Sequence, residues 1–183
     1  MFQKTHGRQS WAARLLLAPY RLGTWWSSRW LTRGRAPAVV VAPGIWLGWA
    51  PGRADWPQLP IGAVLDVAAE FSGRRTTLPS RSVPLLDLIV PSAEELAQAV
   101  AALDELVART PRPVLVHCAL GHSQAAVVVA AWLLRHGLAA TTAAVARVRA
   151  AQPRAVLGPA HRAALVAFLA SQPIDNDYLK TAA

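Results

Sequence analysis

The stretch from Leu115 to Trp132 reads LVHCALGHSQAAVVVAAW and holds the only cysteine of the chain. The apolar run RPVLVHC, which ends at Cys118, is typical of a strand buried on both faces. A short loop with Gly121 follows, and QAAVVVAAWLLRHG predicts a helix that stops at Gly137. This order of strand, tight loop and helix directs several main-chain N–H groups at one point. The helix N-terminus adds a partial positive charge there.

Such a loop predicts an anion site beside a reactive thiol. A phosphate would fit among the N–H groups, and the same field would favour the thiolate, so we expect Cys118 to ionise more easily than an ordinary cysteine. Gly121 allows a main-chain conformation that other residues resist. The alternative is that Cys118 is a small buried hydrophobic residue, as free cysteines often are. The flanking His117 and Gly121 favour the anion site.

Strand and helix patterns alternate on both sides of this stretch. Their order predicts an α/β fold with a central, mostly parallel sheet flanked by helices, and the cysteine loop between a strand and a helix. The expected strands are an opening strand or hairpin over 37–48 with a turn at Pro43 and Gly44, then 62–68, 82–88 and 112–118. The expected helices cover 91–109, 124–137, 141–153 and 159–172.

The helix predicted over 91–109 has the clearest local signals. Ser92 is expected to cap it and Glu95 to complete a capping box. One apolar stripe is expected along its length, formed by Leu96, Val100, Leu103 and Val107.

The charge of the chain is strongly positive and unevenly distributed. The formal net charge is +9, and no acidic residue precedes Asp55. A second stretch without acids runs from Leu106 to Ile174 and includes the cysteine loop. This uneven positive charge favours an anionic partner.

Nucleic acid is not expected, because no zinc spacing, recognition-helix pattern or aromatic-basic strand motif is present. One cysteine cannot form an internal disulfide, so nothing indicates an oxidising compartment.

The sequence divides into three parts: a basic, Trp-rich segment over 1–37, a domain over 38–172 and a tail over 173–183. In the first part, aromatic and apolar residues recur at helix-like intervals between arginines, with Pro19 separating two short helices. Its arginines argue against a membrane-spanning helix, and the three-part pattern of a signal peptide is missing. Residues 11–31 suit an anionic membrane surface, or equally packing on the domain. We expect a cytoplasmic protein, peripheral at the inner membrane face in the first case.

At VLVHCALGHSQAA the sequence resembles the signature of cysteine-dependent protein phosphatases, which is His-Cys, five residues, Arg, then Ser or Thr. The wider resemblance, over roughly residues 38–170, is to the dual-specificity branch. It includes APGIWLGWAPGRADWPQLPIGAVLDVAAEF, VPLLDLIVPS and the last helices. In detail the chain is most similar to bacterial dual-specificity-like domains that often follow a membrane-bound lipid-phosphatase domain.

The resemblance implies a mechanism. Cys118 would attack phosphorus and form a cysteinyl-phosphate, and Asp87 would protonate the leaving oxygen. His117 would hold the loop and tune the thiol, whereas Asp66, in the middle of a strand, is expected to be structural. The main-chain amides of the loop would bind the phosphate oxygens, namely those of Ala119, Leu120, Gly121, His122, Ser123 and Gln124. We expect no metal and no cofactor.

Two residues depart from this signature. Gln124 stands where the family has the arginine that grips two phosphate oxygens, and Ala125 stands where it has the hydroxyl residue. Glutamine is shorter and uncharged, so anion binding weakens. An arginine in phosphoryl transfer contributes roughly 10³–10⁵ in rate, or about 4–7 kcal/mol of barrier. The missing hydroxyl also slows the release of the thiolate.

Other cations could take the place of the missing arginine. His122 could donate some charge if protonated, and Arg154 or Arg162 could reach the loop from later helices. His161, within GPAHRAAL, is expected to cap and pack its helix.

Three hypotheses follow. The chain is a phosphatase-fold domain that binds a phosphorylated ligand or membrane lipid but hydrolyses it poorly, or an active phosphatase with a compensating cation, or a sulfur-transferring, rhodanese-like domain. The spacing His-Cys-x-x-Gly and the Asp87 segment favour phosphatase ancestry, and the missing arginine favours impairment. A phosphorylated protein, a phosphoinositide and a small phosphate ester all remain as substrates.

Overall fold

The computed structural model describes residues 4–5, 8–9, 36–52, 55–69, 76–86 and 89–172. The first two pieces pair as short antiparallel strands, β1 (Lys4–Thr5) and β2 (Arg8–Gln9). The expectations for residues 11–31, including the two helices around Pro19, lie outside the described residues. The same holds for the tail over 173–183 and for Asp87.

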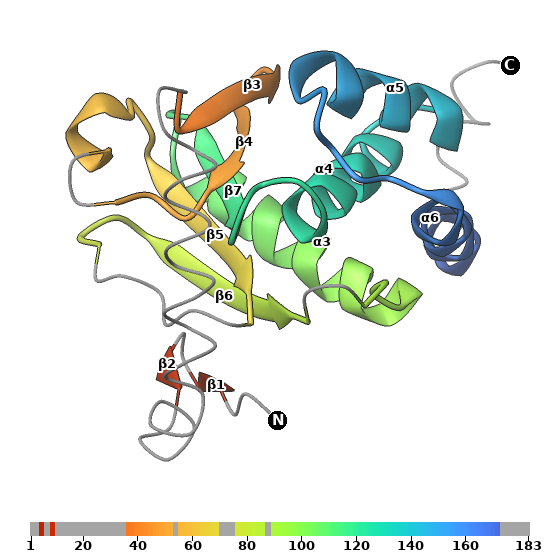
Figure 1. The fold of residues 1–183 in the computed structure, drawn as a ribbon. Coiled ribbons are helices and arrows are strands. Elements are labelled where there is room, and N and C mark those ends of the chain that lie inside the picture. Colours follow the sequence, from red (N-terminus) through yellow and green to blue (C-terminus); the bar gives the residue numbers. More distant parts are fainter. Residues whose placement is uncertain are drawn as a thin grey trace, which may run out of the picture.

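A five-stranded sheet with the order β3-β4-β7-β5-β6 forms the centre of the domain (Figure 1). Its strands are β3 (Ala38–Ala42), β4 (Ile45–Trp49), β5 (Ala63–Ala68), β6 (Ser80–Leu85) and β7 (Val114–Cys118). β3 and β4 form the expected antiparallel hairpin, while β4, β7, β5 and β6 are parallel. The predicted, mostly parallel sheet is confirmed.

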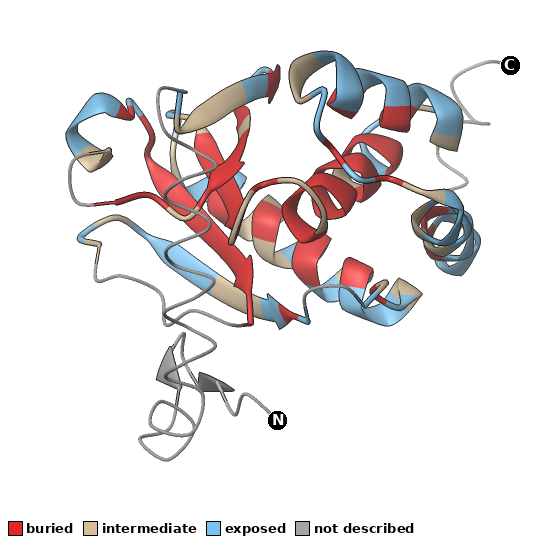
Figure 2. Cartoon of the chain, in the orientation of Figure 1, coloured by how far each residue is buried: buried red, intermediate tan, exposed pale blue. Residues whose placement is uncertain are grey.

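Helices cover one face of this sheet. They are α3 (Ala93–Arg109), α4 (Gln124–Arg135), α5 (Thr141–Ala151) and α6 (Pro159–Ser171). α3 and α4 pack against the strands, α5 packs on α4 and on edge strand β3, and α6 packs on the outer side of α3 and α4 (Figure 1). β5, β7 and nearly all of α4 are buried (Figure 2), which explains their unbroken apolar runs. The α/β fold expected from the alternating pattern is confirmed.

A smaller apolar cluster covers part of the opposite face. Leu115 of β7 and Val64 of β5 pack there with Leu59 and Ile61, which follow the short 3₁₀-helix η1 (Trp56–Gln58). Their strand neighbours, such as Val114 and Val116, point into the main core. Successive residues of a strand alternate between faces, so β7 contributes to both clusters and is buried throughout.

α3 confirms its predicted start but not the whole of its apolar stripe. Ser92 and Glu95 form the capping box. Val107 is 36% exposed, so its predicted place in the stripe is wrong, and Leu106 is buried instead. The buried positions near the end of the helix advance by three residues per turn, from Leu103 to Leu106. Spacings of three and four residues both keep a side chain on the same side of a helix, and here the position three residues after Leu103 faces the core.

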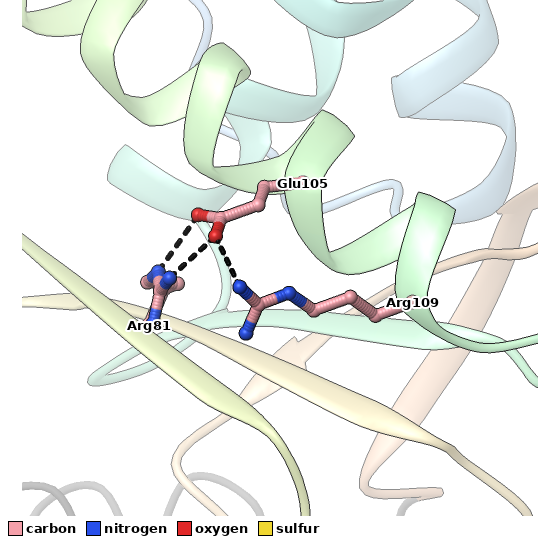
Figure 3. A network of polar contacts seen from close by, with 3 residues as sticks. All are labelled: Arg81, Glu105 and Arg109. Atoms are coloured by element: carbon pink, nitrogen blue, oxygen red, sulfur yellow. Dashed lines mark hydrogen bonds and ion pairs between the residues drawn. The ribbon is translucent and has the colours of Figure 1, made fainter.

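An ion-pair network joins edge strand β6 to α3 (Figure 3). Arg81 donates from Nε and Nη2 to the two carboxylate oxygens of Glu105, over 2.8 and 2.5 Å. Arg109 donates to Oε1 of the same carboxylate over 2.6 Å. The hydrogen bonds from Arg81 lower the pKa of Glu105. The network holds β6 in place, and the chain continues from this strand towards the cysteine loop.

The loop after β7 is pressed against the end of β4. Gly121 has a φ of 71°, in the left-handed region. A Cβ atom at this position would lie 2.5 Å from the carbonyl oxygen of Gly48 and 3.1 Å from the amide nitrogen of Trp49. Only glycine combines this dihedral angle with this close approach.

Within the described ranges, no helix combines the length and the hydrophobicity that crossing a membrane requires.

We predict that Gly121→Ala destabilises the domain more than Gly44→Ala does. Both glycines have positive φ, 71° and 77°, but nothing lies within 4 Å of a Cβ atom at Gly44. Gly44→Ala should cost about 1–2 kcal/mol from the dihedral angle alone. Gly121→Ala adds a main-chain clash and should cost about 2–5 kcal/mol. Urea unfolding of both variants measures the difference, and equal losses would contradict the close contact with β4.

Candidate active site

The predicted loop lies at the carboxyl end of the parallel strands. Cys118 is the last residue of β7, next to Trp49 of β4 in the strand register, and Gln124 is the first residue of α4. The residues between them form the connection. β7 lies between β4 and β5, so the loop emerges from the middle of the sheet. Open α/β sheets bind their ligands at this kind of position.

Main-chain N–H groups converge on the sulfur of Cys118. The N–H group of Gly121 donates to Sγ over 3.2 Å, and the N–H groups of Ala125, Leu120 and Ser123 also act on the sulfur. Leu120, Gly121 and Ser123 are among the residues whose amides the sequence assigns to the phosphate, whereas Ala125 is not. The N–H groups close on the thiol itself, which is only 6% exposed.

The expected ease of ionisation of Cys118 is contradicted. Burial raises the pKa of this thiol, and the N–H groups of Ala125, Gly121, Leu120 and Ser123 offset the effect only in part. A thiolate loses its hydration when it is buried, whereas N–H dipoles recover only some of that energy. α4 begins directly after the loop, as predicted, and the N–H groups there lower the pKa of Cys118. Desolvation of the buried thiol raises this pKa by more.

The side chain of Gln124 reaches the segment that follows β6. Its Nε2 donates to the carbonyl oxygens of Leu86 and Ile89, over 2.5 and 3.1 Å. The residue is 2% exposed. Its Oε1 is buried and has no hydrogen-bond partner among the residues that the structure describes. Asp87 stands between Leu86 and Ile89 in the chain.

His117 and Asp66 lie side by side on β7 and β5. They are partners in the parallel register, and each is 6% exposed. Nδ1 of His117 lies 3.9 Å from Oδ1 of Asp66, and that oxygen also accepts the N–H of Ala68 over 3.0 Å. Asp66 therefore has the structural role that the sequence predicts: its carboxylate lies beside the ring of His117, at the start of the cysteine loop. The pairing could have been inferred because two adjacent, otherwise apolar strands each contain one such polar residue, Asp66 in β5 and His117 in β7.

Residues far along the chain hold the other side of the loop. Oγ of Ser123 lies 3.3 Å from Nε2 of His161 on α6, and the N–H of Val156 donates to the carbonyl oxygen of His122 over 2.7 Å. Desolvation lowers the pKa of His161. The segment GPAHRAAL begins α6 with Gly158 as its N-cap, as predicted, and the side chain of His161 also contacts the loop. No sequence signal indicates this contact.

The candidate cations from later helices do not complete the site. Arg154 and Arg162 are both exposed, and no hydrogen bond or ion pair links either side chain to the loop in the described part of the chain. Metal-binding clusters of three or more His, Cys, Asp or Glu residues are likewise not found among the described residues.

This geometry suits the binding of an anion by main-chain donors. Four N–H groups and the N-terminus of α4 face the position of one sulfur atom, and no acidic residue occurs in the sequence from Leu106 to Ile174.

Three comparisons place this arrangement among known proteins. A family model described as "Dual specificity phosphatase, catalytic domain" matches residues 50–170. No curated protein sequence matches the chain.

Solved structures share the fold at low sequence identity. Tk-PTP in the active form has a TM-score of 0.67 and 19% identity, and the match covers 74% of this chain and 98% of that chain. Human DUSP28 has a TM-score of 0.62 and 24% identity, covering 73% and 93%. PTPMT1 in complex with PI(5)P has a TM-score of 0.65 and 19% identity, covering 73% and 95%. Since the family model spans more than half of the sequence, including the whole cysteine loop, this chain belongs to the dual-specificity phosphatase family of the cysteine-dependent tyrosine phosphatase superfamily.

Proposed function

We propose that this domain binds phosphate monoesters in the loop from His117 to Gln124 and hydrolyses them only weakly through Cys118. One observation carries the proposal. Both hydrogen-bond donors of the Gln124 side chain are used on the carbonyl oxygens of Leu86 and Ile89. The position that supplies a phosphate clamp in the family signature therefore contributes neither a charge nor a free donor.

In the proposed reaction, Sγ of Cys118 attacks phosphorus as a thiolate. The S–P bond forms while the P–O ester bond breaks, and Asp87 gives its proton to the leaving oxygen. The main-chain amides of residues 119–124 hold the phosphate oxygens. Water then attacks the cysteinyl-phosphate: the new P–O bond forms as the S–P bond breaks, one water proton goes to the Asp87 carboxylate, and phosphate and the Cys118 thiolate are released.

Three features slow this reaction. Without a guanidinium, the transition state lacks an interaction worth roughly 10³–10⁵ in rate. Burial raises the pKa of Cys118, so a smaller fraction of the protein carries the thiolate. Ala125 is fully buried and has no hydroxyl, so no side-chain donor at this position stabilises the sulfur when it leaves the cysteinyl-phosphate. Binding relies on main-chain donors, which all of these changes leave in place.

The ligand class is a phosphate ester. The structural similarity to PTPMT1 in complex with PI(5)P supports a phosphoinositide as one candidate. A phosphorylated protein and a small phosphate ester fit the same main-chain donors. The family match supports phosphatase chemistry over the sulfur-transfer alternative.

A working phosphatase with a compensating cation is the second candidate. The observation that favours it is the distance of 3.3 Å between Nε2 of His161 and Oγ of Ser123. Because desolvation lowers the pKa of His161, its imidazole carries a positive charge only in acid. Because this route needs both a protonated His161 and the Cys118 thiolate, hydrolysis would fall at high pH and at low pH, and His161→Asn would remove the fall at high pH.

We predict that restoring the family signature raises hydrolysis of p-nitrophenyl phosphate. Gln124→Arg combined with Ala125→Ser should increase kcat/KM by up to about 10³-fold, because a charged bidentate donor returns. Cys118→Ser should abolish turnover. Gln98→Arg, on an exposed position of α3, controls for the added charge. If the unaltered chain is as fast as the restored variants, the domain is not impaired.

We also predict a high pH midpoint for alkylation of Cys118 by iodoacetamide. Alkylation requires the thiolate, and burial raises the pKa of this thiol, so the rate should reach half its maximum above the pH found for an ordinary cysteine. The same chain unfolded in urea is the control, since its one cysteine is then exposed to solvent. A midpoint below that of the unfolded chain would mean that the N–H groups outweigh burial.

A further inference from the structure

We propose that Gln124 is a positioning residue. Its carboxamide ties the segment from Leu86 to Ile89 to the N-terminus of α4, and the side chain does not bind the phosphate. The inference rests on the proposed function in one respect, namely that Asp87 within this segment is the general acid. The tether itself is inferred only from the two hydrogen bonds that Gln124 donates.

The side-chain amide is fully engaged as a donor. A carboxamide has two N–H bonds, and Nε2 of Gln124 donates to two carbonyl oxygens, at 2.5 and 3.1 Å. Because the residue is 2% exposed, water does not compete for these bonds. An anion in the loop would find no donor left on this side chain.

The side chains of the two tethered residues, Leu86 and Ile89, contribute little burial. Leu86 is 39% exposed and Ile89 is 57% exposed, so apolar burial contributes little at these two positions. β6 ends at Leu85, where the strand hydrogen bonds stop. The two bonds from Gln124 hold the main chain on both sides of Asp87.

The choice of glutamine fits this role. A glutamate would place a carboxylate oxygen against two carbonyl oxygens, and a methionine would offer no donor. Oε1 of Gln124 remains buried without a partner in the described part of the chain, so the site is built around the NH₂ group and not around the amide as a whole. Leaving a buried acceptor unpaired is unfavourable, and the two donated bonds offset it.

Hydrogen exchange of the full chain tests the tether directly. In Gln124→Met, amides in a peptide that spans residues 86–90 should exchange about tenfold faster, because two hydrogen bonds are lost. Gln98→Met is the matched control, since it makes the same chemical change on the exposed face of α3. An unchanged exchange rate in Gln124→Met would overturn the tether, whether or not the domain hydrolyses any substrate.

Binding of inorganic phosphate tests whether Gln124 is a ligand. Protection of Cys118 from iodoacetamide reports the affinity, and in Gln124→Met it should stay within about twofold, because main-chain amides carry the binding. A loss of tenfold or more would overturn the statement that the side chain does not bind phosphate. If phosphate protects neither protein, the proposed function fails while the exchange result still decides the tether.

Leaving-group dependence tests the link to Asp87. A general acid matters most when the leaving group is poor, so Gln124→Met should lower kcat for phenyl phosphate about tenfold more than kcat for p-nitrophenyl phosphate. Gln98→Met should lower neither. Equal losses on the two substrates would mean that the tether supports the fold but does not position the acid.

Discussion

The close contact between Gly121 and the main chain of Gly48 determines the shape of the cysteine loop. It forces the chain to turn back immediately after β7 and brings the N–H of Gly121 to 3.2 Å from Sγ of Cys118. The remaining N–H groups follow because α4 starts directly behind this turn. A parallel sheet makes the contact possible, since β4 and β7 end at the same edge and their last residues are register partners.

The same geometry sets two opposing electrostatic effects on one sulfur atom. N–H dipoles favour a negative charge there, whereas burial of Cys118 disfavours it, and burial dominates. In the family signature a guanidinium adds a full charge to the favourable side. This chain has a net charge of +9, but Arg154 and Arg162 are exposed and do not contact the loop. Overall basicity can draw an anion towards the domain, yet it does not replace a positioned cation.

The loop is held from several directions by elements that are distant in sequence. β4 supports it at Gly121, α6 contacts it through His161 and Ser123, and the main chain of Val156 binds that of His122. Gln124 adds a connection to the segment after β6, a strand that Arg81 and Glu105 join to α3. A preformed loop lowers the energy needed to arrange donors around an anion, which is why binding can persist where chemistry is weak.

The sequence by itself determined the elements and their type. Apolar runs and caps located β7, α3 and α4, and the resemblance of VLVHCALGHSQAA to the phosphatase signature indicated the family, because these signals are local. Only the tertiary structure decided how the pieces act on one another. The burial that raises the pKa of Cys118, the contact of His161 with Ser123 and the direction of the Gln124 side chain all depend on packing between distant segments. No pattern of neighbouring residues encodes such distances, since they arise only when the sheet and helices close around the loop.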